Sequence, residues 1–320
     1  MKKDVTQKHY LKDAERVADI LNGHFFHGEK VIKAEDVVIT DGDSFFFKMG
    51  KETSQIVKRE HDAVYNIVRG ADCFILGLEQ QNYIDPAMVL RSLEYMTGQY
   101  EEQRHEIMRL HEREQDLKAD EHISRFSIED RLRPVIILVI YYGDSEWNGA
   151  RTLHELLDWS HIPEKWKSMF ADYQLHLLEV NKIENLDIYH SDLKLLFGIL
   201  KYRRDKEKLA AFIEDNMEEF SKVATDLARV IGNYSHTKRI LTIIEEKKNK
   251  NEGGTLNMIP AFEEMVEDGR KEGRKEGRKE GAEQFGRLTR CLLSDCRMED
   301  LKRAIEDEEY REKLLEEYEI

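Results

Sequence analysis

Residues 135–142, Val-Ile-Ile-Leu-Val-Ile-Tyr-Tyr, form an uninterrupted apolar run that decides the fold class of this 320-residue chain. The run lies between Arg133-Pro134 and Gly143, and a short apolar run bounded in this way is typical of a strand. Because no polar residue alternates with the apolar ones, both faces of the strand must be covered, as in a sheet between helices. The run therefore predicts an α/β core.

A second buried strand is predicted at residues 73–78, Cys-Phe-Ile-Leu-Gly-Leu, between Asp72 and Glu79. Two interpretations of the preceding residues stay open: a helix over 56–68 followed by this strand, or a hairpin in which 63–68 pair with it. Asp85-Pro86 then favours the start of a long helix towards Lys118, because aspartate caps helices and proline suits their first position. Further elements are expected as helices at 10–22, 153–159 and 164–170 and as strands at 37–40, 44–48 and 175–180.

From residue 191 onward the sequence predicts helices only, at 193–203, 206–215, 218–231 and 238–248. Residues 249–255 read as a linker, and beyond them Gly-Arg-Lys-Glu repeats three times over residues 269–281. We expect a core over 1–190, a helical extension over 191–250, and a linker, repeat and charged helices over 251–320. The repeat is interpreted as a solvated helix or spacer, or as a glycine edge through which C-terminal helices form a homo-oligomer.

The composition excludes several classes of protein. With 50 Lys and Arg against 65 Asp and Glu the net charge is −15, which argues against a generic nucleic-acid coat. No apolar run can span a bilayer, and Met1-Lys-Lys-Asp leads into no signal-peptide segment, so no membrane partner is expected. Three cysteines form no paired framework, and the histidines show no zinc spacing. These features predict a cytoplasmic protein.

The residues that could carry chemistry surround the second strand. Glu79 ends an apolar strand, where a carboxylate is costly unless it meets water, a partner or a cation. Gln81 falls on the same face, and with Asp62 on a neighbouring strand this set could hold Mg²⁺, which takes oxygen ligands and can activate water against a phosphodiester. A solvated strand end is the other interpretation.

Two helices could add to this site. Asp13, Glu15 and Asp19 in the first helix are candidates for a further acid, beside their interpretation as an exposed helix face. Arg91 and Tyr95, one helical turn apart, could contact a phosphate, or Arg91 could form an ordinary salt bridge.

Several of these segments together resemble a known family. The segments are Arg-Glu-His-Asp at 59–62, Phe-Ile-Leu-Gly-Leu-Glu-Gln-Gln at 74–81 and Ala-Met-Val-Leu-Arg-Ser-Leu-Glu-Tyr at 87–95. They resemble the PD-(D/E)XK nuclease family transposases, relatives of the recombination-promoting nucleases, including the clostridial branch. Residues 134–143, 147–149 and 153–157 look like the next block of that family, and its members often carry a glycine-punctuated charged tail such as 269–281.

The resemblance implies a restriction-endonuclease-like mixed-sheet core flanked by helices and followed by an all-helical C-terminal region. It implies DNA cleavage with Mg²⁺ or Mn²⁺, in recombination, transposition or defence. By this resemblance Asp62, Glu79 and the Gln80 carbonyl are metal ligands, and Gln81 replaces the lysine that positions the attacking water.

The remaining implied roles belong to the two helices: Asp19 is a possible additional acid, and Arg91 and Tyr95 position the substrate. One departure matters, because Gln81 is neutral and cannot supply the positive charge of a lysine in the transition state. The alternative is therefore a catalytically lapsed nuclease fold that acts as an interaction protein.

Overall fold

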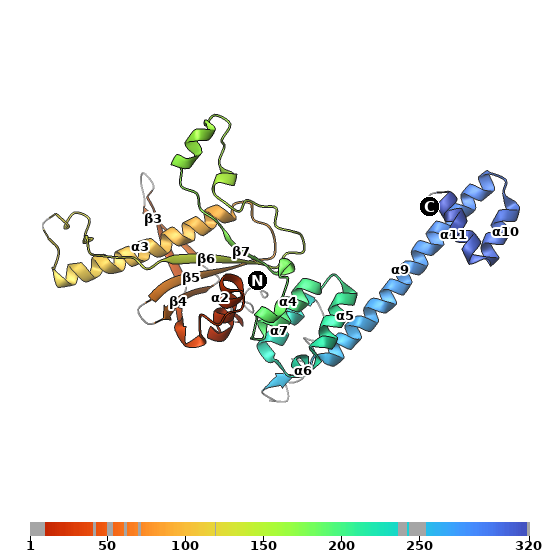
Figure 1. Cartoon of the computed structure of the whole chain (residues 1–320), viewed down its shortest axis with the longest axis horizontal. Coiled ribbons are helices and arrows are strands. Elements are labelled where there is room, and N and C mark those ends of the chain that lie inside the picture. Colours follow the sequence, from red (N-terminus) through yellow and green to blue (C-terminus); the bar gives the residue numbers. More distant parts are fainter. Residues whose placement is uncertain are drawn as a thin grey trace. The chain divides into compact units, whose positions relative to one another are not determined.

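The computed structural model describes residues 10–40, 43–49, 54–60, 63–69, 72–118, 120–235, 242 and 254–318. The chain divides into two compact units, Met1–Met258 and Ile259–Ile320 (Figure 1). Among the described residues, no helix has both the length and the apolar content that a bilayer crossing requires. The three-part division and the cytoplasmic location stay predictions.

The first unit is built on a mixed five-stranded sheet in the order β1-β4-β5-β6-β7. Its strands are β1 (Val37–Thr40), β4 (Ala63–Arg69), β5 (Asp72–Gln81), β6 (Val135–Tyr141) and β7 (His176–Glu179). β4 is antiparallel to β1 and β5, whereas β6 is parallel to β5 and β7. The predicted α/β class with a mixed sheet and flanking helices is confirmed.

The structure resolves the two interpretations of the residues before β5. β4 and β5 form the hairpin, with Ala63 paired to Leu78 and Arg69 paired to Asp72. The helix over 56–68 is wrong, because β3 (Ser54–Glu60) pairs instead with β2 (Asp43–Met49) in a separate two-stranded sheet. β2, β3, β4 and β5 are thus all extended.

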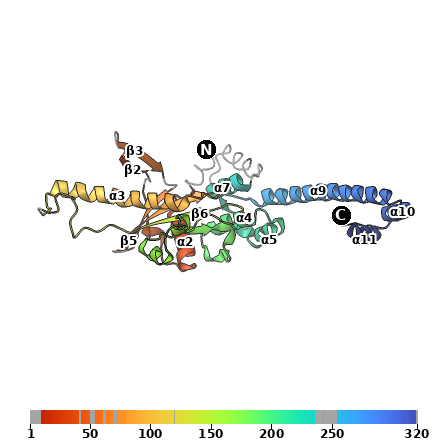
Figure 2. The same cartoon turned by 90° about the horizontal axis from the view of Figure 1, so that it is seen from above.

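Helices cover both faces of the five-stranded sheet. α3 (Met88–Glu114) packs on the face that carries Ile75, Ile137 and Val139. α2 (Ala14–Phe26) lies on the opposite side (Figure 2), the face of the intervening residues of β5 and β6, such as Leu76 and Leu138. Each fully buried aliphatic side chain of this kind contributes roughly 1.5–3 kcal/mol.

The helix ends differ from those expected. α3 begins at Met88 rather than at Pro86, and Asp85 accepts a hydrogen bond from the Ala87 amide (2.9 Å) just before it. α2 begins one residue after its cap, Asp13, and continues past Asn22 to Phe26. Asn22 does not end the helix because its amide group bonds the backbone of Ile32.

The crossover from β6 to β7 holds only short 3-10 helices where longer helices were expected. These are η2 (His154–Leu156) and η3 (Glu164–Met169), in the green segment of Figure 1. Backbone hydrogen bonds join residues 151–153 to residues 173–175 of this crossover, including one from the Leu175 amide to the Arg151 carbonyl (2.8 Å). β7 is followed by the turns η4 (Val180–Lys182) and η5 (Leu186–Ile188).

Helices complete the first unit: α4 (Leu193–Tyr202), α5 (Lys206–Asp215), α6 (Met217–Phe220) and α7 (Thr225–Ser235). The single helix expected over 218–231 is wrong, because β8 (Val223–Ala224) interrupts it by pairing with β9 (Thr255–Leu256). Except for Thr242, the helix predicted over 238–248 lies outside the described residues, as do residues 249–253 of the predicted linker.

The second unit contains α9 (Ile259–Ser294), α10 (Met298–Glu306) and α11 (Glu308–Glu317). Leu288, Leu292, Ala304 and Leu314 form its buried core. The Gly-Arg-Lys-Glu repeat lies within α9. The C-terminal region is therefore helical as predicted, whereas homo-oligomer formation stays a prediction.

Candidate functional site

The candidate site lies at the end of β5. Glu79 is 2% exposed and Gln81 5% exposed, so both polar side chains are buried. They alternate with Gln80 and share the α3 side of the sheet with Ile75. Their neighbours across the parallel ladder are Val139 and Tyr141 of β6. The prediction that Glu79 and Gln81 share one face is confirmed.

Gln80 takes the opposite face. Its side-chain carbonyl accepts a hydrogen bond from the Tyr142 hydroxyl at 3.1 Å. Its backbone carbonyl is therefore the only group of Gln80 that could bind a cation together with Glu79.

Arg91, in the first turn of α3, brings the helix and the strand together. Its Nη2 lies 3.5 Å from Glu79 Oε2 and donates a hydrogen bond to the Tyr95 hydroxyl at 2.8 Å. Its Nη1 lies 2.8 Å from Asp85 Oδ2. The Arg91 side chain is 27% exposed, so its guanidinium reaches the surface while it contacts the buried Glu79 and Tyr95 and the half-buried Asp85.

Asp85 is a site residue that the sequence interpretation missed. Its position before a helix suggested only a cap, although a carboxylate six residues before Arg91 was the available signal. Burial alone would raise the pKa of Asp85, but the hydrogen bonds from Arg91 and the Ala87 amide outweigh it and lower that pKa. Burial likewise opposes the charge of Arg91, yet its bonds to Asp85 and Tyr95 raise the pKa of the guanidinium. Arg91 and Asp85 are therefore both charged at neutral pH.

The two other predicted acids are not seen beside Glu79. Asp62 lies outside the described residues; the described ladder between β4 and β5 ends at the pair Ala63 and Leu78. Asp19 is buried in α2, where its carboxylate accepts hydrogen bonds from the amides of His190 and Ser191 and from the Ser191 hydroxyl (2.6 Å). The structure thus gives Asp19 a structural partner on the other side of the sheet.

The other helix acids also have local roles. The Asp13 carboxylate caps α2 by accepting from the amides of Glu15 and Arg16, and Glu15 lies in the first turn. Favourable interaction with the helix N-terminus accounts for both positions.

The oxygen donors near β5 suit a hard cation in part. Within the described residues, no group of three or more His, Cys, Asp or Glu side chains could hold a metal ion. The described donors are the Glu79 carboxylate, the Gln81 amide and the Gln80 backbone carbonyl. Mg²⁺ is commonly bound through one or two carboxylates together with water and substrate phosphate, so this small donor set fits it.

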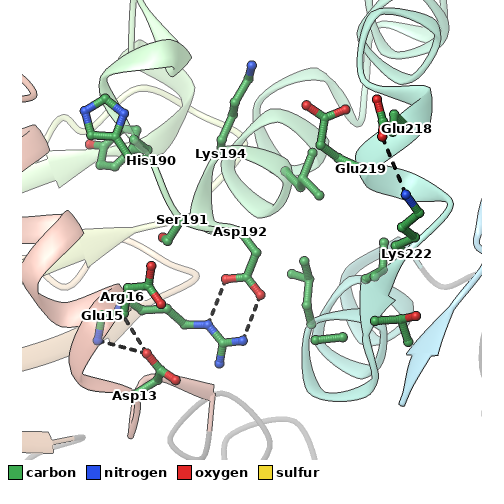
Figure 3. Close-up of a pocket in the computed structure, with 16 residues that line it drawn as sticks. Asp13, Glu15, Arg16, His190, Ser191, Asp192, Lys194, Glu218, Glu219 and Lys222 are labelled. Carbon is green, nitrogen blue, oxygen red and sulfur yellow. Dashed lines mark hydrogen bonds and ion pairs between the residues drawn. The ribbon is translucent and has the colours of Figure 1, made fainter. Parts of the chain in front are cut away.

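A separate cavity of about 650 Å³ lies between α2, the start of α4 and the α6–α7 segment (Figure 3). Arg16, 8% exposed, lies at its wall and donates to both carboxylate oxygens of Asp192 (2.8 and 2.7 Å), to Asp226 (2.5 Å) and to the Tyr10 carbonyl (2.9 Å). Lys222 is paired with Glu218 on the other wall. Arg16 therefore fastens α2 to α4 and α7, and we assign this cluster a structural role.

The family comparison covers the candidate site. The model of a family described as "Putative transposase, YhgA-like" matches residues 54–229, from β3 into α7. This range contains all the predicted site residues except the acids of the first helix, Asp13, Glu15 and Asp19, and the clostridial branch stays a prediction. No curated protein and no solved structure gives a significant match to the chain.

Proposed function

The chain belongs to the YhgA-like transposase family, which is of the PD-(D/E)XK type, and from this premise we propose that it is a Mg²⁺-dependent endonuclease that cleaves DNA. The observation that carries the proposal is the buried pair Glu79 and Gln81 on one face of β5, with the Arg91 guanidinium 3.5 Å from the Glu79 carboxylate. The carboxylate can hold a cation, the amide can orient a water and the arginine can bind a phosphate, and together they support this function.

The proposed roles follow from the chemistry of each group. Glu79, with Asp62 and the Gln80 carbonyl, would hold the cation, which when bound supplies an activated water and neutralises charge on the phosphate. The Gln81 amide can orient a water through a hydrogen bond but adds no positive charge. Arg91 supplies that charge, since a guanidinium can bind phosphate oxygens in a bidentate manner.

The surroundings of Arg91 favour this use. The Asp85 ion pair and the Tyr95 hydroxyl hold its two terminal nitrogens, so little side-chain freedom is lost when a phosphate binds. Arg91 and Tyr95 are thus proposed to position the substrate, with Asp85 as an additional support for Arg91.

One observation favours a second candidate function. Arg91 lies at 3.5 Å from Glu79, and a cation already paired with the carboxylate opposes the approach of a metal ion. A nuclease fold that has lost cleavage and acts as an interaction protein would keep such a pair permanently.

Plasmid nicking separates the two candidates. The full chain is incubated with supercoiled plasmid and Mg²⁺ or Mn²⁺, with EDTA as the metal-free arm, beside Glu79→Gln and the matched control Glu106→Gln. Glu106 is an exposed carboxylate on α3, so its substitution removes the same charge away from β5.

We expect metal-dependent nicking by the wild type and the control, and at least about 100-fold slower nicking by Glu79→Gln. Far-UV circular dichroism and thermal unfolding establish that the variants are folded. Equal nicking by Glu79→Gln would refute the role of Glu79, and no nicking by a folded wild type in either metal would refute the enzyme and leave the interaction protein.

A further inference from the structure

The carboxyl ends of three neighbouring strands meet at one edge of the sheet. β5, β6 and β7 are mutually parallel, so this edge contains the Glu79 site and the residues that follow β6 and β7. In open α/β sheets the crevice outside this edge is where ligands bind. We call it the carboxyl edge.

Past the end of β6, a carboxylate holds two arginines that directly follow α4. Asp144 accepts a hydrogen bond from Arg203 Nε at 2.7 Å and is also paired with Arg204. Arg203 additionally donates to the Tyr142 carbonyl, which fixes the end of α4 at the carboxyl edge (Figure 1). The Arg204 side chain is 76% exposed, so its charge faces solvent.

At the end of β7, a second carboxylate holds two more cations. Glu179 has a side chain only 6% exposed, pairs with Arg151, and lies 3.7 Å from Lys182 Nζ. The Trp147 amide donates to the same carboxylate at 3.0 Å and fixes its position. The side chains of Arg151 and Lys182 are 42% and 45% exposed, so the acid is covered while the cations are not.

This arrangement concentrates outward-facing cations in a chain whose net charge is −15. Lys182 has one further acidic neighbour, Glu146 at 3.6 Å, whose side chain is 82% exposed and can turn away. A guanidinium has five N–H donors and an ammonium three, so each cation can keep its carboxylate and still donate to an anion.

We propose that Arg151, Lys182 and Arg204 bind the phosphate backbone of DNA beside the scissile phosphate at Glu79. The inference rests on the proposed function in taking DNA as the substrate. Neighbouring strands lie about 4.8 Å apart, so β7 is roughly 10 Å from β5. That separation corresponds to about three base-pair steps of 3.4 Å, and the cations therefore contact phosphates close to the cleaved one.

The salt dependence of DNA binding tests this directly. Fluorescence anisotropy of a labelled 20-base-pair duplex is measured in EDTA, where no cleavage occurs, at a series of NaCl concentrations. Lys182→Gln and Arg204→Gln are compared with wild type and with Lys222→Gln. Lys222 is the matched control, because it is an exposed lysine paired with a glutamate, and the cavity that it lines contains none of the carboxyl-edge residues.

Each phosphate contact contributes about −0.9 to the slope of log K against log salt. We expect each edge variant to weaken binding several-fold and to reduce the slope by about that amount, while Lys222→Gln behaves as wild type. Unchanged slopes and affinities in both edge variants would overturn the inference even if plasmid nicking succeeds. Reduced slopes in a protein that does not nick would support the DNA surface and reject only cleavage.

Discussion

Replacement of Arg16 by methionine should destabilise the first unit strongly. The Arg16 side chain is 9% exposed and donates to Asp192, Asp226 and the Tyr10 carbonyl, which joins three helices. Removal of one partner from a buried ion pair costs about 3–5 kcal/mol. The side chains of Asp192 and Asp226 are 26% and 33% exposed and retain some hydration, so we expect the lower value, about 3 kcal/mol.

The measurement is equilibrium unfolding in urea followed by tryptophan fluorescence. All three tryptophans, Trp147, Trp159 and Trp166, lie in the first unit, so the signal reports on that unit alone. A loss of 3 kcal/mol is a factor of roughly 150 in the unfolding equilibrium constant. It should appear as a clear shift of the urea midpoint.

Lys208→Met is the matched control. Lys208 is 69% exposed and pairs with Asp205 at 3.0 Å, and exposed pairs of this kind contribute little to stability. If Arg16→Met lost no more free energy of unfolding than Lys208→Met, the argument that Arg16 holds the helices together would be wrong.

Two further predictions concern pH and packing. Burial and the nearby histidine charges lower the pKa of His24 to about 4, so the unfolded chain takes up the proton first as pH falls below about 6.5. The free energy of unfolding should therefore fall by up to about 3 kcal/mol between pH 6.5 and 4. In urea unfolding, His24→Gln should lose less free energy than the wild type over this pH range, and an identical loss would contradict the role of His24. A Cβ on Gly198 would come within 2.0 Å of the Phe212 ring, so calorimetry should show Gly198→Ala destabilised by about 1–3 kcal/mol. A Cβ on Gly281 meets no atom of another described segment within 4 Å, so Gly281→Ala should gain up to about 1 kcal/mol of helix stability. Equal transition shifts in the two variants would contradict this.

The strands and the strand-end pair could be predicted from sequence because their signals are local. The apolar run at 135–142 requires covered faces, and the spacing of Glu79 and Gln81 places them on one face whatever surrounds the strand. The start of α3 was misplaced by only two residues, since Asp85 and Pro86 are ambiguous between a cap and the turn before it.

The remaining features depend on contacts between distant residues. The choice of hairpin over helix before β5 depends on the pairing of β4 with both β1 and β5, and the break after Phe220 depends on the pairing of Val223 with Leu256. Asp19 looked like a free helix acid because its partner, Ser191, lies far along the chain. No periodicity in a single segment can reveal such a partner.

Two of the residues that bind α2 are synthesised much later than α2 itself. Its partners Ser191 and Asp226 lie 172 and 210 residues further along the chain than the α2 residues that they bind. At a ribosomal rate of about 5–20 residues per second, α2 waits roughly 10–40 seconds before its last partner is made. During that interval its apolar face, with Val17, Ile20 and Leu21, has no finished core to enter. α2 is consequently synthesised long before its last partner, and nascent chains are exposed to aggregation or chaperone binding through this helix for that time.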